Sequence, residues 1–70
     1  MMETVVYIGT KLKRARLAKA MNQRQLAERA GVTKTTLVQL ENNRSQPHPS
    51  TLGKLAEALD VSPADLMEGE

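Results

Sequence analysis

The sequence contains no cysteine, no tryptophan and no phenylalanine, and one tyrosine is its only aromatic residue. Without cysteine the chain forms no disulfide, thiolate zinc site or thiol nucleophile, which suits a reducing compartment. No apolar run approaches the ~18 residues of a membrane span, and the N-terminus has no basic region followed by an apolar stretch. We therefore expect a soluble, cytoplasmic protein with no membrane association.

A length of 70 residues allows one small domain. Such a chain buries only about 60% of its unfolded surface, so it has no room for a second lobe around an enclosed active-site cleft. We expect no enzyme activity, cofactor, metal or small-molecule ligand. The only histidine, His48, lies between two prolines without a second histidine or a cysteine, and we interpret it as a loop residue.

The net charge of +2 conceals an asymmetry along the chain. Residues 11–44 carry nine basic and two acidic side chains, a net charge of +7, whereas residues 45–70 carry one basic and five acidic ones, a net charge of −4. A basic half favours a polyanionic partner such as nucleic acid, although solvated helix faces produce milder versions of this pattern.

Apolar residues at helical spacing predict five helices. The first covers residues 8–19, and the second covers 23–30, with Asn22 as its N-cap and Gly31 as its end. Thr33 caps a third helix over 34–43, while prolines open a fourth at 49–59 and a fifth at 63–67. We expect the glycine at position 53 to permit close packing within the fourth helix.

The fold class is accordingly all-α, a compact bundle of five helices over residues 8–68. Residues 1–7 form a short N-terminal arm, which is either a frayed terminus or a segment that pairs with a second copy or drapes over the core. The link between the second and third helices is only about three residues long, so these helices must cross at a steep angle. Ala27 is small where the third helix crosses, and Gly31 provides the positive φ of the turn.

On these residues the sequence resembles the helix-turn-helix domains of phage repressor and Cro type, the XRE family. The resemblance covers about 60 residues and implies a fold of the lambda-repressor type, with the second and third helices as the helix-turn-helix. It departs from the family at Asn43 and Asp60, where glycine is usual, but both residues tolerate the left-handed conformation. The matches are Arg16, Asn22, Gln23, Leu26, Ala27, Gly31, Val32, Leu40, Glu41, Asn42, Pro47 and the closing runs at 55–59 and 61–62.

The third helix has two distinct faces. Its helical projection predicts that Thr36, Leu37 and Leu40 are buried. The opposite face carries side chains that are able to read base edges, through a glutamine amide for adenine, an ammonium group for guanine and apolar groups for a thymine methyl. An ordinary solvated helix face is the alternative interpretation. The expected base-reading residues are Lys34, Thr35, Val38 and Gln39.

A second group of polar side chains suits the phosphate backbone of DNA. Some lie at the N-terminus of the second helix, whose amides and positive dipole end favour anions, and others at the end of the third helix. Three basic residues on the first two helices, Lys11, Arg14 and Arg24, are weaker candidates, because exposed basic side chains are most often only solvated. The expected phosphate-binding residues are Asn22, Gln23, Arg24, Asn42, Asn43, Arg44, Lys11 and Arg14.

The resemblance also implies an ion pair between Arg16 and Glu41, which would set the angle of the third helix. One domain of this size makes few base contacts, so we expect a homodimer on a palindromic double-stranded DNA operator. The dimer surface expected from the family comprises Val61, Pro63, Leu66 and Met67, and the N-terminal arm is a second option.

The function that follows is sequence-specific DNA binding by a small transcriptional regulator, a repressor or a controller protein. The alternative is a protein-interaction module on the same fold, such as an antitoxin, in which Leu17 and Val38 would contact the partner and DNA binding would be secondary.

Overall fold

The computed structural model describes residues 7–67. This range forms five α-helices, α1 (Gly9–Ala18), α2 (Gln23–Ala30), α3 (Lys34–Glu41), α4 (Pro49–Leu59) and α5 (Pro63–Leu66). The expected all-α bundle is confirmed. None of these helices is long and apolar enough to cross a membrane. The expected arm lies outside the described residues except for Tyr7.

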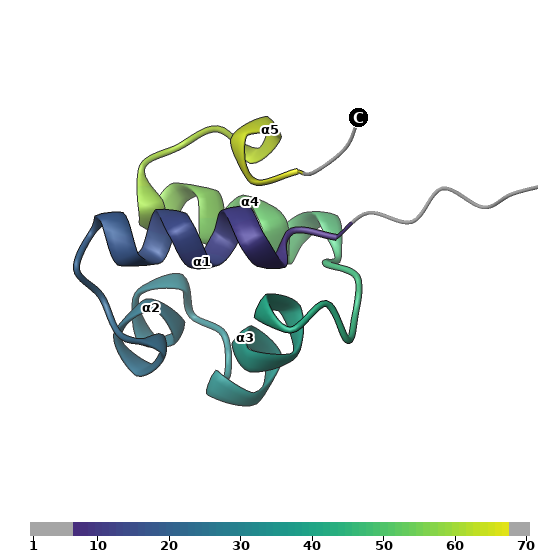
Figure 1. Cartoon of the computed structure of the whole chain (residues 1–70), viewed down its shortest axis with the longest axis horizontal. Helices are drawn as coiled ribbons and strands as arrows, with labels where there is room; N and C mark the ends of the chain where they lie inside the picture. Colours follow the sequence, from purple (N-terminus) through teal and green to yellow (C-terminus); the bar gives the residue numbers. More distant parts are fainter. Residues whose placement is uncertain (1–6, 68–70) are drawn as a thin grey trace, which may run out of the picture.

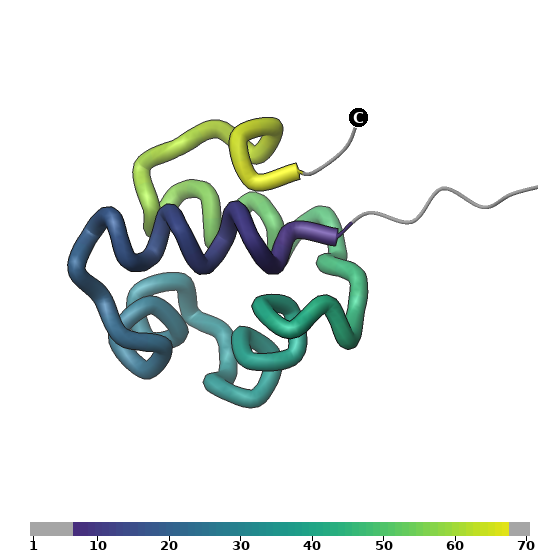
Figure 2. Tube along the Cα trace, in the orientation of Figure 1, coloured from purple at the N-terminus to yellow at the C-terminus, as the bar shows by residue number. Residues whose placement is uncertain are grey.

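Helix α1 runs through the centre of the molecule, with α4 behind it, α5 on one side and α2 and α3 on the other (Figure 1). Helix α2 packs against both α3 and α4, while α1 contacts α3 and α5. The Cα trace in Figure 2 follows the short turn that leads from α2 into α3 on the same side of α1. The helix-turn-helix is therefore a layer supported by α1 and α4.

Aliphatic side chains from all five helices form one core. The side chain of Leu66 is only 1% exposed. Its expected place at a dimer surface is wrong, because this residue closes the core where α5 packs against α1 and α4. The largest fully buried side chains are Ile8, Leu12, Leu26, Leu37, Leu40, Leu55, Leu59 and Leu66.

The helix ends follow the expected capping chemistry. Asn22 Oδ1 accepts a hydrogen bond of 2.8 Å from the Gln25 N–H, and Gln25 Oε1 accepts one of 2.8 Å from the Asn22 N–H. Thr33 Oγ1 accepts the Thr36 N–H at 3.0 Å. His48, expected only to be a loop residue, caps α4, because its Nδ1 accepts the Ser50 N–H at 3.1 Å.

Within residues 7–67, three residues other than glycine have left-handed backbone conformations. Asn43 and Asp60, with φ of 57° and 59°, adopt the conformation that glycine usually takes in the family, and Ala20 also has φ of 57°. An alanine is strained in this region because its Cβ approaches the following carbonyl oxygen. The expected packing role of Gly53 is wrong, since a Cβ at this exposed position would meet no atom within 4 Å.

Candidate nucleic-acid interface

The outer face of α3 contains a shallow hollow of about 330 Å³ lined by Lys34, Thr35, Val38 and Gln39. These are the four residues expected to read bases, and the fold brings them together on one surface. Three of the four are exposed, and Val38 is half-buried. The site thus combines an ammonium group, a hydroxyl and an amide around one apolar side chain.

The opposite face of α3 explains why this surface points outward. Leu37 and Leu40 are fully buried in the core, as expected from the helical projection. Thr36 departs from that projection, because it is only half-buried in the first turn of α3. Its Oγ1 accepts a hydrogen bond of 2.9 Å from the hydroxyl of the capping residue Thr33. The apolar anchor of α3 therefore consists of the two leucines.

The ion pair between Arg16 and Glu41 is present and joins α1 to the last residue of α3. Arg16 Nε donates to Glu41 Oε2 at 2.7 Å, and Nη2 donates to Oε1 at 3.2 Å. The two side chains are only 8% and 2% exposed. Arg16 Nη1 also donates to the Met21 carbonyl oxygen at 2.8 Å. This guanidinium therefore connects three parts of the chain: α1, α3 and the loop that precedes α2.

Gln23 also contacts the same carboxylate, and the phosphate contact expected of it stays a prediction. Its Nε2 donates to Glu41 Oε1 at 3.1 Å, and its side chain is half-buried. The expectation of a phosphate contact considered only the position of Gln23 at the start of α2. No local pattern in the sequence predicts this bond, which joins residues 18 positions apart.

Asn43 is also engaged within the chain. Its Oδ1 accepts the N–H of Gly9, the first residue of α1, at 3.0 Å. The Asn43 oxygen thus serves the N-terminus of α1, while the phosphate contact expected of this exposed residue at the end of α3 stays a prediction. The close approach depends on Gly9, where a Cβ would clash with Asn43 Oδ1 and with the Glu41 carbonyl oxygen.

The other expected phosphate-binding residues remain exposed. Asn22 uses its oxygen as a helix cap, while Arg24 Nε makes an exposed pair of 3.3 Å with Glu28 within α2. Such surface pairs contribute little to stability, so Arg24 is not held away from a phosphate. The exposed residues of this group are Lys11, Arg14, Asn22, Arg24, Asn42 and Arg44.

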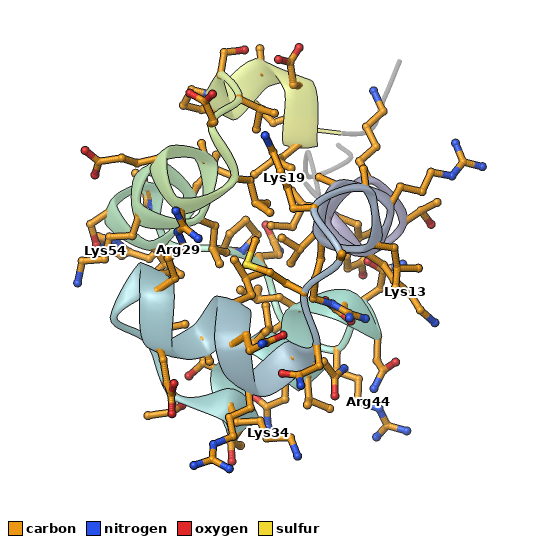
Figure 3. All side chains as sticks on the ribbon, turned by 90° about the vertical axis from the view of Figure 1, so that its left-hand side faces the viewer. Lys13, Lys19, Arg29, Lys34, Arg44 and Lys54 are labelled. Atoms are coloured by element: carbon orange, nitrogen blue, oxygen red, sulfur yellow. The ribbon has the colours of Figure 1, made fainter. Side chains whose placement is uncertain are left out.

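Figure 3 shows how some of the basic side chains are distributed. Lys34 and Arg44 project from the side of the molecule formed by α2 and α3, whereas Lys54 of α4 projects at a different edge. The exposed acidic residues Glu57, Asp60 and Asp65 belong to α4, its end and α5. The charge asymmetry of the sequence thus becomes a difference between helices, with excess positive charge on α1 to α3.

Comparisons with known proteins agree with this geometry. Residues 12–66 match the model of the helix-turn-helix family HTH_3. The transcriptional regulator SutR of Escherichia coli K12 is 40% identical over 55 residues, which are 79% of this chain and 31% of SutR. The chain therefore spans about a third of the length of this curated relative.

Two solved structures have the same fold. The biofilm regulator SinR of Bacillus subtilis, solved in complex with DNA, is 38% identical with a TM-score of 0.81, over 84% of this chain and 95% of that chain. The restriction-modification controller C.AhdI of Aeromonas hydrophila is 30% identical, also with a TM-score of 0.81, over 84% and 89%. SinR has also been solved with the protein SinI.

The chain belongs to the helix-turn-helix family of DNA-binding regulators, of the repressor and Cro type. The resemblance deduced from residues such as Ala27, Gly31 and Glu41 is confirmed by the family match and by the shared fold.

Proposed function

We propose that this chain is a small transcriptional regulator that binds double-stranded DNA with α3 in the major groove. The observation that carries the proposal is the hollow on the outer face of α3, lined by Lys34, Thr35, Val38 and Gln39. Cation, amide, hydroxyl and methyl groups are the chemistry that distinguishes base pairs in the major groove. Two buried leucines and one buried ion pair hold this surface in place.

The side chains of this surface make three kinds of base contact. The Gln39 amide donates to N7 and accepts from the N6 amino group of an adenine, and Lys34 donates to the N7 and O6 acceptors of a guanine. Val38 and the Thr35 methyl group contact the C5-methyl group of a thymine. None of these contacts involves the making or breaking of a covalent bond, so the protein acts as a binding module rather than an enzyme.

Phosphate contacts at the start of α2 and after the end of α3 fix the register of α3 in the groove. The exposed Asn22 and Arg24 lie at the start of α2, where backbone N–H groups also point outward. The exposed Asn42 and Arg44 follow the last turn of α3. Such contacts supply affinity without sequence preference, and Lys11 and Arg14 on α1 add positive charge nearby.

The proposed active form is a homodimer on a two-fold symmetric operator in the cytoplasm, acting as a repressor or controller. One hollow with four side chains covers only a few base pairs, so two copies supply the specificity that one lacks. The candidate dimer surface now comprises Val61, Pro63 and Met67, because Leu66 is buried. Met67 is 40% exposed, which suits an apolar contact with a second copy.

Selection from random duplexes at low salt tests this function. The expected result is an enriched motif with two-fold symmetry and half-sites about one helical turn apart. Sedimentation of the complex should then show two chains for each duplex, and a single chain at saturation would contradict the dimer. No enrichment of any duplex would overturn DNA recognition and favour a protein partner that contacts Leu17, which is 58% exposed.

A further inference from the structure

Asn43 and Gly9 form a contact that the base-reading and phosphate-binding surface does not explain. The N–H of Gly9 is the first of the helix amides in α1 that lack a partner within the helix. Ile8, at the N-cap position, offers no side-chain acceptor. The acceptor comes instead from Asn43 Oδ1, 34 residues along the chain at the end of α3.

The two residues are complementary in shape as well as in hydrogen bonding. Gly9 is buried, and the place of its missing Cβ is occupied by Asn43 Oδ1 and the Glu41 carbonyl oxygen. Only a residue without a side chain allows α1 to begin directly against the end of α3. Asn43 stands where the resemblance implies glycine, and a glycine there has no side-chain oxygen to offer.

Asn43 also shapes the chain that leaves α3. Its φ of 57° turns the backbone out of the helix. The N–H of Asn43 donates to the Leu40 carbonyl oxygen at 3.2 Å, and the N–H of Arg44 donates to the Gln39 carbonyl oxygen at 2.8 Å. The side chain that holds α1 therefore belongs to Asn43, which lies between two proposed phosphate contacts, Asn42 and Arg44.

A second attachment between the same helices lies at the other end of α1. Gly9 and Arg16 are seven residues apart, which is about two helical turns and places them on one face of α1. Arg16 contacts Glu41, and Gly9 contacts Asn43. These two attachments add to the core contacts between α1 and α3 and help to fix the relative direction of the two helices.

We propose that Asn43 and Gly9 are a positioning pair that fixes the end of α3 and the phosphate contacts around it, without either residue touching DNA. The proposal rests on the proposed function, because its consequence is measured as DNA affinity. In this proposal Asn43 does not contact phosphate itself. It positions the backbone of Asn42 and Arg44, which do. A change in this pair should weaken binding to all duplexes equally, since phosphate contacts carry no sequence preference.

Asn43→Gly is the informative variant, because glycine keeps the left-handed backbone and removes only the side chain. Hydrogen exchange in the free protein should show the Gly9 amide exchanging about fivefold faster or more, the effect of losing one hydrogen bond. Asn43→Asp should restore the protection, because a carboxylate accepts the same N–H and suits the positive end of α1. If Asn43 only contacted phosphate, its substitution would not alter the exchange of the Gly9 amide in the absence of DNA.

DNA binding is measured by anisotropy with the selected operator and with an unrelated duplex of equal length. Asn43→Gly should weaken both by a similar factor of about five. Ala58→Gly is the control for stability, since it destabilises α4 but lies outside the proposed interface. It should leave both affinities unchanged well below its melting temperature.

Three results would overturn the positioning pair. One is an unchanged Gly9 exchange rate in Asn43→Gly, and another is full DNA affinity despite faster exchange. A third is an equal loss of affinity in Ala58→Gly, which would attribute the effect to stability alone. Failure of the proposed function is distinct, because the unsubstituted protein would then bind neither duplex.

Discussion

The guanidinium of Arg16 and the carboxylate of Glu41 face each other with two hydrogen bonds, of 2.7 and 3.2 Å, and both side chains are almost completely buried. The pair joins the middle helix of the bundle to the helix that carries the proposed base-reading residues. A third bond, from Gln23 Nε2 to the same carboxylate, brings in the start of α2. One buried anion thereby connects the three helices that meet at the interface.

Removal of one member of this pair should be costly. We expect Arg16→Met to lower the free energy of unfolding by about 3 to 5 kcal/mol, because it leaves the Glu41 carboxylate buried without its counter-ion. The double variant Arg16→Met with Glu41→Leu should recover a large part of this loss, since no uncompensated charge remains. Urea unfolding followed by far-ultraviolet circular dichroism measures both. A loss below about 1 kcal/mol in the single variant would show that the pair behaves as an exposed one.

Arg44 and Lys54 provide a matched test of the phosphate contacts. Both are exposed cations, but Arg44 follows α3 while Lys54 projects from α4 at another edge of the molecule (Figure 3). We expect Arg44→Ala to reduce the slope of log affinity against log salt by about 1, because one fewer phosphate is neutralised. Lys54→Ala should keep the original slope. Equal slopes for the two variants would remove Arg44 from the interface.

The left-handed conformation of Ala20 predicts a stabilising substitution. Ala20→Gly should raise the free energy of unfolding by about 1 kcal/mol, because it relieves the contact between Cβ and the carbonyl oxygen at φ of 57°. Ala18→Gly, two positions earlier at the end of α1, should lower it by roughly 0.5 kcal/mol through the entropy of the unfolded chain. The melting temperatures of the two variants should thus shift in opposite directions from that of the unsubstituted protein. A lower melting temperature for Ala20→Gly would mean that the turn is not strained.

The sequence predicts the helices well because their ends depend on local chemistry. Asn22, Gly31 and Thr33 act within three or four residues of their own positions, and spacing alone identifies the buried Leu37 and Leu40. The four residues around the hollow on α3 follow from the same periodicity. The left-handed backbone at Asn43 and Asp60 agrees with the resemblance, which places glycine there.

Local capping chemistry and helical periodicity do not predict contacts between distant parts of the chain. The bonds from Gln23 to Glu41 and from Gly9 to Asn43 depend on how α1, α2 and α3 meet, and no local pattern encodes them. Leu66 illustrates the same limit: an apolar residue on a short helix suits a dimer surface or a core equally well by sequence. Its burial is decided by the packing of α5 against α1 and α4.

The central claim is that the outer face of α3 reads base sequence, and parallel selections from random duplexes with the unsubstituted protein and Gln39→Ala test it most directly. We expect Gln39→Ala to lose preference at one base position in each half-site, with a cost of roughly 1 to 3 kcal/mol there and no change elsewhere. An unchanged motif, or equal weakening on every sequence, would contradict base reading by this face.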